Sequence, residues 1–266
     1  MTNQCSALLG RSLLGLFLST AGFSPAAEPV ASPPEAIPAE LREDYKLVWQ
    51  DEFNGTTLDP KKWRVRGEGV NRKLGVVSGK TISLDGKGNC VISVLKGPDG
   101  KNLIGQIATQ GLFDPTYGYF ECRAKMNRSI GPHVAFWLQS PTLGKTGDPA
   151  VDGSEVDIFE FHRRAPDTVH HCVHWDGYGE KHKMHGNQAI RPNIGEGFHT
   201  FGLLWTPKEY VFYVNGKETW RTDKAVSRRS LFIILSTELS GWGGDIAKGK
   251  LPDQVVFDYV RVYQQK

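Results

Sequence analysis

The chain has 266 residues, which is long enough for one large domain with a substantial hydrophobic core. Its formal net charge is only +3, and this small excess argues against a dedicated nucleic-acid surface, because such surfaces are strongly basic. The 30 glycines and the aromatic content of 11% are more typical of a turn-rich β protein than of a helical one.

The first 26 residues have the pattern of an export signal. Arg11 is their only charged residue, the apolar run 13–18 follows it, and residues 24–26 (Ser-Pro-Ala) offer a small-x-small cleavage site. The apolar run is too short to span a bilayer, and no later stretch is long enough. We therefore expect a signal peptide over 1–26, a secreted or periplasmic mature protein, and no membrane attachment after cleavage.

Residues 27–40 follow the predicted signal and contain four prolines among small residues. This composition is typical of a linker without a packed core. We see no internal repeat in the rest of the chain. The sequence therefore predicts a linker over 27–40 and one folded domain over 41–266, acting as a monomer.

Three cysteines remain once Cys5 is assigned to the signal peptide. An odd number requires at least one free thiol or an intermolecular bridge. Cys90 and Cys122 lie in strand-like segments and could pair, although we favour three buried, apolar cysteines that include Cys172. The sequence leaves the pairing open.

Almost every segment after residue 45 has the pattern of a short strand between turns. Asn215-Gly216 separates two of these segments and is a strong signal for a two-residue hairpin turn. No long stretch shows a 3.6-residue apolar period with helix caps. We therefore predict an all-β sandwich or jelly roll. The expected strands are residues 47–49, 90–95, 117–126, 134–138, 198–205, 210–214, 217–221, 231–235 and 255–263.

The segment 153–162, GSEVDIFEFH, carries three carboxylates among large apolar residues. Side chains alternate along a strand, so Glu155 and Asp157 share one face. Strict alternation would place Glu160 on the opposite face. One extra residue, a β-bulge near Ile158-Phe159, would return Glu160 to the face of Glu155.

A row of three carboxylates is electrostatically costly, because each ionised group raises the pKa of its neighbours. A solvated acidic face is the simplest alternative for such a run. A glycosidase, however, requires this arrangement, since one carboxylate attacks while another stays protonated to donate its proton. The apolar residues between the carboxylates favour a central strand and therefore a catalytic function.

The sequence resembles glycoside hydrolase family 16 in its bulged-motif, laminarinase- and agarase-like branch. EVDIFE resembles the family's signature. LVWQDEFNGTTLDPKKW, GQIATQGLFDPTYGYFECRAKM, AFWLQS, FHTFGLLWTPKEYVFYVNGK and FDYVRVY extend the similarity over roughly residues 45–264. The resemblance implies a concanavalin-like β-jelly roll of two curved antiparallel sheets, with a concave cleft that binds a polysaccharide.

By this resemblance, Glu155 is the nucleophile, Glu160 is the general acid/base, and Asp157 orients the nucleophile. The implied activity is endo-acting hydrolysis of a β-glucan or an algal galactan with net retention by double displacement. Two alternatives stay open: a non-catalytic carbohydrate-binding module on the same fold, and a transglycosylase that uses the same residues.

Five further residues are candidates for substrate binding. Trp137 lies on the strand before the catalytic one and is the best platform for stacking a sugar ring. His174 and Trp175 follow the catalytic strand. Glu238 and Trp242 are expected to close the other side of the cleft.

The reaction requires no cofactor, and the histidines between residues 162 and 185 fit no compact metal signature. The resemblance does suggest a structural calcium, with Glu52, the backbone of Gly88, and Asp258 as ligand candidates. One segment departs from the laminarin-cleaving members. A Trp commonly precedes the apolar run that ends in their cleft-floor Trp, whereas this chain has Gly-Pro-His at 131–133, and this difference argues against laminarin. Residues 236–238 (Ser-Thr-Glu) and the basic, His-rich loop 177–185 are more similar to members that act on algal galactans.

Overall fold

The computed structural model describes residues 37–266, which belong to one compact unit. The predicted signal peptide and most of the predicted linker lie outside the described residues. Within the last part of that linker, Ala39–Leu41 form a short 3-10 turn (η1), and Ile37 packs against a small cluster that contains Leu41. Regular packing therefore begins a few residues before position 41.

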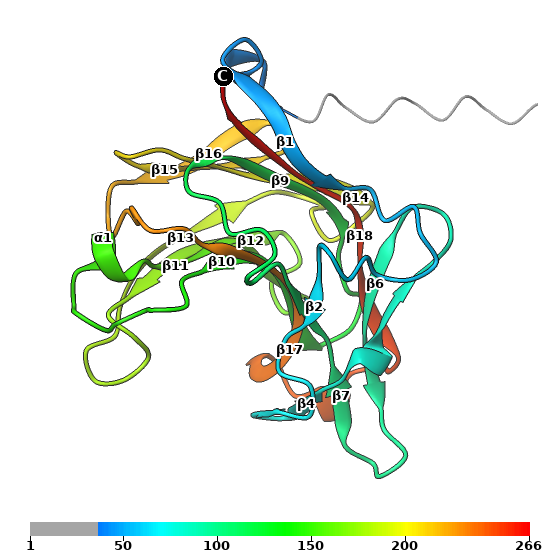
Figure 1. The fold of residues 1–266 in the computed structure, drawn as a ribbon. Helices are drawn as coiled ribbons and strands as arrows, with labels where there is room; N and C mark the ends of the chain where they lie inside the picture. The colour runs from blue at the N-terminus through cyan, green and yellow to red at the C-terminus, as the bar shows by residue number, and fades with distance from the viewer. Residues whose placement is uncertain (1–36) are drawn as a thin grey trace, which may run out of the picture. The chain divides into compact units, whose positions relative to one another are not determined.

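Two β-sheets make up the described chain, and Figure 1 shows them as stacked, curved layers. All strand pairs are antiparallel except β4 with β7. The predicted all-β fold of two curved sheets is confirmed. The larger sheet has the order β16-β15-β14-β9-β18-β6-β7-β4-β3, while β1 pairs with β18 and β5 with β6. Its strands are β1 (Tyr45–Asp51), β3 (Asn71–Arg72), β4 (Gly75–Val77), β5 (Ile82–Leu84), β6 (Cys90–Lys96), β7 (Asn102–Ile104), β9 (Gly118–Lys125), β14 (Phe198–Trp205), β15 (Tyr210–Val214), β16 (Lys217–Thr222) and β18 (Asp253–Gln265).

The smaller sheet has the order β13-β12-β11-β10-β17-β8-β2 and contains the predicted catalytic strand. Its strands are β2 (Arg64–Val65), β8 (Gln106–Ala108), β10 (Gly131–Gln139), β11 (Glu155–His162), β12 (Thr168–Trp175), β13 (Lys183–Ile190) and β17 (Phe232–Gly243). Besides η1, the described helices are α1 (Pro149–Asp152), η2 (Gly79–Thr81) and η3 (Ile246–Lys248). None of these helices is long and apolar enough to cross a membrane.

The hydrophobic core fills the space between the two sheets. Phe136 and Phe159 of the smaller sheet and Phe120 and Phe201 of the larger sheet belong to one fully buried cluster. The rings of Phe159 and Phe201 meet across the interface with their centroids 4.2 Å apart. Because alternate residues of each strand point into this core, the residues between them face outward from each sheet.

The β15–β16 hairpin confirms the turn predicted from Asn215-Gly216. Val214 pairs with Lys217, so the loop has two residues. Asn215 has φ 52° and Gly216 has φ 70°, the left-handed backbone that a type I′ turn requires. Most other predicted strands also form, although β17 continues well beyond residue 235. The expected strands did not include β12, β13 or the short strands β2, β3, β4, β5, β7 and β8. Of these, β13 is a largely exposed edge strand with few apolar residues.

The three cysteines of the described chain are all buried and free. Cys90 and Cys122 lie on β6 and β9, and β18 separates these two strands in the sheet. The interpretation of three buried thiols is therefore confirmed, and the alternative pairing of Cys90 with Cys122 is wrong.

Candidate active site

A β-bulge in β11 brings the three carboxylates to one face of the smaller sheet. Against β10, Phe136 pairs with Phe159 but the next residue, Trp137, pairs with Asp157, so Ile158 is an extra residue. Ile158 and Phe159 both point into the core and are fully buried. The bulge predicted from the sequence is confirmed, and it turns Glu160 outward beside Asp157.

A cleft of about 450 Å³ lies on this outward face. Its lining comes from β10, β11 and β17, together with residues of the segment that contains β2 and β3 and one tyrosine from the β12–β13 loop. The residues that line it are Arg66, Arg72, Lys73, His133, Ala135, Trp137, Gln139, Glu155, Asp157, Glu160, Tyr178, Ser236, Glu238, Ser240 and Trp242.

Glu155 is held by two hydrogen bonds that end on the same oxygen. Gln139 donates its Nε2–H to Glu155 Oε2 over 2.8 Å, and the hydroxyl of Tyr178 donates to that oxygen as well. Burial raises the pKa of Glu155 to about 7 and the charge of Asp157 adds to this, while the hydrogen bonds from Tyr178 and Gln139 lower it. Oε1 receives no hydrogen bond from the described residues, so one oxygen of this carboxylate stays available on the cleft side.

Glu160 has a different environment. None of the described residues donates a hydrogen bond to it, and the nearest ring nitrogen, Nε2 of His133, is 3.8 Å from its Oε1. Burial, followed by the charge of Asp157, raises its pKa well above the usual range for a glutamate. Burial also lowers the pKa of His133 to about 4, so this ring is neutral and does not stabilise the carboxylate anion. Glu160 is therefore the carboxyl group that retains its proton.

Asp157 lies between the two glutamates and is paired with His174 of β12. Nε2 of His174 is 3.2 Å from Asp157 Oδ2, and its Nδ1 is 2.8 Å from Nε2 of His182. Burial alone would lower the pKa of His174, but the neighbouring Asp157 carboxylate raises it to about 11. The imidazolium of His174 therefore donates to a neutral His182 and balances the negative charge of Asp157. His174 contacts Asp157 and His182, and its predicted part in substrate binding stays a prediction.

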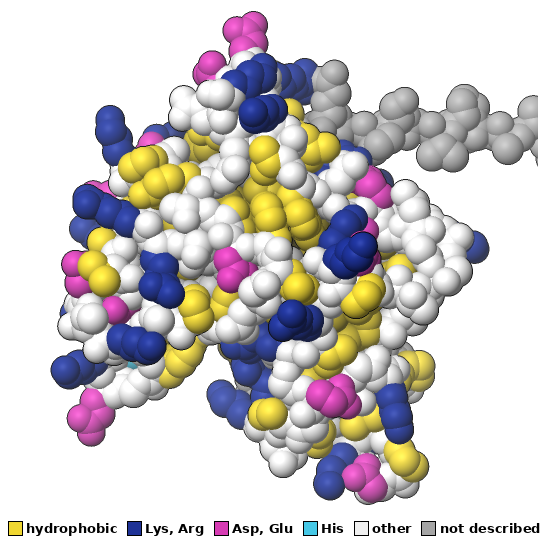
Figure 2. Space-filling model, viewed as in Figure 1, with side chains coloured by type: hydrophobic (Ala, Val, Ile, Leu, Met, Phe, Trp, Pro, Cys, Tyr) yellow, Lys and Arg dark blue, Asp and Glu magenta, His cyan; other side chains and the backbone are white. Residues whose placement is uncertain are grey.

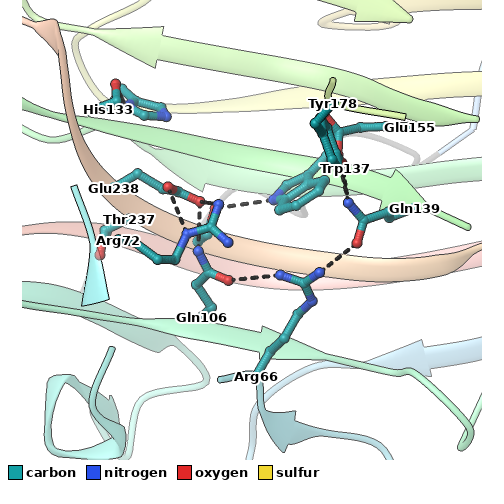
Figure 3. Close-up of polar contacts among 12 residues, drawn as sticks. Arg66, Arg72, Gln106, His133, Trp137, Gln139, Glu155, Tyr178, Thr237 and Glu238 are labelled. Atoms are coloured by element: carbon teal, nitrogen blue, oxygen red, sulfur yellow. Dashed lines mark hydrogen bonds and ion pairs between the residues drawn. The ribbon is translucent and has the colours of Figure 1, made fainter. Parts of the chain in front are cut away.

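Trp137 forms the floor of the cleft, as predicted. It is 94% buried by its neighbours, and its ring Nε1–H donates to Ser236 Oγ over 3.1 Å. The guanidinium of Arg66 lies 5.6 Å from the ring centroid of Trp137. Arg66 also donates to the side-chain oxygens of Gln106 and Gln139, so it connects the floor to the amide that holds Glu155 (Figure 3).

The opposite end of the cleft contains Glu238 and Trp242, also as predicted. Arg72 forms a two-point ion pair with Glu238, with distances of 3.0 and 3.1 Å, and Gln106 donates to the same carboxylate over 2.6 Å (Figure 3). Trp242 is 37% exposed and its ring lies edge-on to three imidazoles of the smaller sheet. These imidazoles are His133, His162 and His170, with centroid distances of 5.5, 4.5 and 4.7 Å.

The structure corrects the prediction for Trp175. Glu155 pairs with His174 across β11 and β12, so His174 faces the cleft. Alternation then turns Trp175 to the other side, where it packs against the main core, and it is not among the cleft-lining residues.

The residues proposed for calcium are also arranged differently from a calcium site. The carboxylate of Glu52 pairs with Arg261 through contacts of 2.7 and 2.8 Å, and Asp258 pairs with Arg123 at 2.5 Å. The backbone of Gly88 lies near that of Glu52, because a side-chain carbon built at Gly88 would be 3.6 Å from the backbone oxygen of Glu52. Because both carboxylates are bound to guanidinium groups, these side chains do not fit a calcium ion in this arrangement.

Several cleft residues were not identified from the sequence. Gln139 could have been found by alternation, because it is two residues from Trp137 and directly follows the predicted strand 134–138. Arg66, Arg72 and Tyr178 carried no such signal, since each reaches the cleft from a loop or a very short strand far from β11 in the chain.

Comparison with known proteins shows which chains are similar to this one in sequence and fold. The family model described as "Glycosyl hydrolases family 16" matches residues 76–261. A β-glucanase of Rhodothermus marinus is 31% identical over 246 residues, which cover 83% of this chain and 85% of that protein. β-Porphyranase B of Zobellia galactanivorans is 25% identical over 261 residues, which cover 87% of this chain and 88% of that protein.

Among solved structures, a variant of SCLam, a non-specific endo-β-1,3(4)-glucanase from family 16 crystallised with a glucan oligosaccharide, superposes with a TM-score of 0.73. It is 32% identical, and the match covers 87% of this chain and 98% of that chain. Some other curated relatives are longer proteins, and the matches cover 56%, 33% and 34% of three of them.

Proposed function

The chain belongs to glycosyl hydrolase family 16, and from this premise we propose that it is a retaining enzyme that cleaves internal β-glycosidic bonds of a polysaccharide by double displacement. Glycoside hydrolysis and endo action are properties that its relatives share. The retaining stereochemistry, the roles of the individual carboxylates, the polymer and the site of action in the cell are the proposed part.

The unequal surroundings of Glu155 and Glu160 are the observation that carries the proposal. A retaining mechanism needs one ionised carboxylate to attack and one protonated carboxyl group to donate. Both groups are half-buried beside Asp157, but only Glu155 receives hydrogen bonds that stabilise its anion. These surroundings support Glu155 as the nucleophile and Glu160 as the general acid.

In the first step, the free oxygen of Glu155 attacks the anomeric carbon while Glu160 transfers its proton to the leaving glycosidic oxygen. This step forms a glycosyl-enzyme ester on Glu155 and leaves Glu160 ionised. Gln139 and Tyr178 hold Oε2 of Glu155 and keep Oε1 directed at the sugar. Trp137 provides the apolar surface on which the ring stacks.

In the second step, Glu160 takes a proton from a water molecule, and the resulting hydroxide attacks the anomeric carbon. The ester bond to Glu155 breaks, and the product keeps its β configuration. Asp157 keeps its position in this cycle, because His174 pairs with it and is itself held by His182.

Two cations of the cleft lining, rather than its net charge, favour a polymer that carries anionic groups over a neutral β-glucan, since four carboxylates also line the cleft. Arg72 is neutralised by Glu238, but neither Arg66 nor Lys73 has an ion-pair partner among residues 37–266. Burial lowers the pKa of Arg66, and the positive charge of Arg72 lowers it further, because both disfavour the charged guanidinium. In Figure 2, Lys and Arg side chains gather at the notch in the lower edge of the molecule. We infer an algal galactan with sulfate groups as the better candidate.

Lys73 allows this inference to be tested without disturbing the carboxylates. Lys73→Ala should lower kcat/KM on porphyran or carrageenan by about 3- to 10-fold. An ion pair between the lysine ammonium and a sulfate group contributes about 1 kcal/mol at a partly exposed site. The same change should leave kcat/KM on laminarin and agarose unaffected. An equal loss on charged and neutral polymers would contradict the inference.

A depolymerisation screen tests the central proposal. The wild type and Glu155→Gln would be incubated with laminarin, mixed-linkage glucan, agarose, porphyran and carrageenan, and reducing ends would be followed. Cleavage by the wild type alone supports the assignment, and equal cleavage by the variant would refute it. Polymer binding without cleavage by either protein would support a carbohydrate-binding module instead.

Two further measurements separate the remaining alternatives. Proton NMR of the first products distinguishes retention from inversion, because the β-anomer appears first only when two displacements occur. Product sizing distinguishes hydrolysis from transglycosylation, since transfer makes some chains longer than the input.

We propose secretion or periplasmic location on the basis of the N-terminal segment, which has one charge, an apolar run and a small-x-small site. Mass spectrometry of the exported protein should find Ala27 as the first residue. An intact N-terminus in the exported fraction would contradict this assignment.

A further inference from the structure

Three metal-ligating side chains of different chemistry meet on the cleft-side face of β11 and β12. Asp157 of β11 pairs with Cys172 of β12, and His174 lies two residues along the same strand on the same face. A carboxylate oxygen, the thiol sulfur and a ring nitrogen lie within 4.8 Å of one another. No other group of three such residues was found in residues 37–266. The histidine spacing in the sequence gave no indication of this cluster, because its members come from two strands.

The cluster contains a buried acceptor whose hydrogen bonding is incomplete. Asp157 Oδ2 is inaccessible to solvent, and although His174 Nε2 forms an ion pair with it at 3.2 Å, the ring is not aligned for a hydrogen bond to that oxygen. A buried carboxylate oxygen without a donor costs free energy, which a bound cation would recover. Asp157 also lines the cleft, so an ion can reach it from solvent.

The second nitrogen of His174 is already held in the way that metal-binding imidazoles are held. His174 Nδ1 lies 2.8 Å from His182 Nε2, and the two rings stack with an interplanar angle of 12°. This contact fixes the ring and leaves Nε2 directed at Asp157. Histidine ligands of metal sites commonly have such an outer partner, which orients the ring and increases its basicity.

We propose that Asp157, Cys172 and His174 form a binding site for a thiophilic divalent cation, for which zinc is the probe. Zinc bonds of about 2.0–2.3 Å place tetrahedral ligands about 3.5 Å apart, so atoms that lie within 4.8 Å of one another need to close by about 1.3 Å at most. The fourth position would face the cleft. On binding, the cation displaces the proton of the Cys172 thiol and one proton of the His174 imidazolium, and both are released to solvent.

Occupancy of this site inhibits the enzyme. The cation takes the carboxylate that lies between Glu155 and Glu160, and it breaks the pairing of His174 with Asp157. It also places a positive charge beside Glu160, which favours the ionised form of the general acid. This inhibition rests on the proposed function, whereas the binding of zinc does not.

The chain supplies its own matched control. Cys90 is also a buried free thiol, but it lies in the core between the sheets, away from Asp157 and His174. Removing Cys90 therefore changes the number of thiols without changing the cluster. Cys172→Ser keeps the size of the side chain and provides a second variant in case Cys172→Ala does not fold.

Isothermal titration of the metal-free protein with zinc chloride tests the site directly. The wild type and Cys90→Ala should each bind one zinc ion, and Cys172→Ala and Cys172→Ser should bind it at least tenfold more weakly. Titration with cadmium chloride should produce a thiolate-to-metal charge-transfer band in the wild type and in Cys90→Ala only. Circular dichroism and thermal unfolding confirm that each variant is folded.

Absence of zinc binding by the wild type would overturn the proposal, as would equal binding by folded Cys172→Ala or Cys172→Ser. For inhibition, zinc should slow hydrolysis by the wild type reversibly with EDTA, and Cys172→Ala should lose this sensitivity relative to its own metal-free rate. An unchanged rate at saturating zinc would overturn the inhibitory role. If no polymer is cleaved, the titrations still decide the binding site, so failure of the proposed function is recognised separately.

Discussion

Two glutamates, one in each sheet, show how the carboxylate proposed as the nucleophile differs from a structural one. Glu121 lies on β9 of the larger sheet and is 2% exposed, and Glu155 lies on β11 at the cleft. Burial raises the pKa of each to about 7, and each receives a hydrogen bond from a tyrosine. A shifted pKa and a tyrosine partner therefore do not identify the active site.

The difference lies in which oxygens are bound. Tyr119 donates to Glu121 Oε2 and Tyr259 donates to its Oε1, each over 2.8 Å, so both oxygens are occupied and enclosed. At Glu155, both donors end on Oε2, and Oε1 remains unbonded on the face that lines the cleft. A nucleophile needs an accessible lone pair, and only Glu155 has one.

The largest expected effect comes from replacing each glutamate by glutamine. Glu155→Gln should lower kcat by about 10⁴-fold, because the amide cannot form the glycosyl-enzyme ester. Glu121→Gln should leave kcat within about twofold, since it lies in the other sheet and touches no cleft residue. Reducing-end assays on the polymer found in the screen measure both. A comparable loss in the two variants would remove the distinction.

Tyr178→Phe should have the next largest effect. It removes one of two hydrogen bonds to the ionised nucleophile, which contributes about 1.5–3 kcal/mol, or about 10- to 100-fold in kcat/KM. Because that bond lowers the pKa of Glu155, its loss raises this pKa, and the acidic limb of the pH profile should move to higher pH. A lower rate with an unshifted limb would mean that Tyr178 only contacts the sugar.

Stability should respond to pH in the same direction at both glutamates, even though only one is catalytic. The folded pKa of about 7 lies above the ordinary value of 4.5, so each contributes stability that is present below pH 4.5 and is lost as the pH rises through 7. Glu121→Gln and Glu155→Gln should each reduce the loss of unfolding free energy between about pH 5 and pH 8 by about 1–3 kcal/mol.

Urea unfolding at the two pH values measures this effect. Comparison with the wild type cancels the opposite contribution of His133, whose pKa is lowered to about 4 by burial and which destabilises the fold as the pH falls below 6.5. If only Glu155→Gln changes the slope, Glu121 does not carry a raised pKa.

The smallest expected effect is that of Tyr259→Phe, the counterpart of Tyr178→Phe in the larger sheet. Loss of one hydrogen bond to Glu121 should reduce the unfolding free energy by about 1 kcal/mol without moving either limb of the pH–rate profile. Thermal unfolding and the pH dependence of kcat/KM provide the two readouts. A shift of the acidic limb would indicate that the two sheets are coupled.

The sequence predicted the catalytic strand because its information is local. Side-chain alternation, the large apolar residues between the carboxylates and the odd spacing of Glu155, Asp157 and Glu160 together predicted a bulge. In the structure, Ile158 is the extra residue. The Asn215-Gly216 turn was predictable for the same reason, since its backbone conformation depends on two residues alone. Strand β13 was missed because edge strands need little apolar patterning.

The partners of the catalytic carboxylates were not predictable in this way. Gln139, Tyr178 and Arg66 reach Glu155 from β10, from the β12–β13 loop and from the end of β2. Trp175 was assigned to the cleft because it is next to His174, but adjacent residues of a strand face opposite sides.

The sequence by itself determined the fold class, the bulged strand and the identity of three carboxylates, because period, turn chemistry and residue type are properties of short segments. The tertiary structure alone decided which carboxylate is hydrogen-bonded, which retains its proton, and that Cys172 meets Asp157 and His174. Protonation and ligand geometry depend on burial and on neighbours brought from distant strands, and these distances are set only when the two sheets pack.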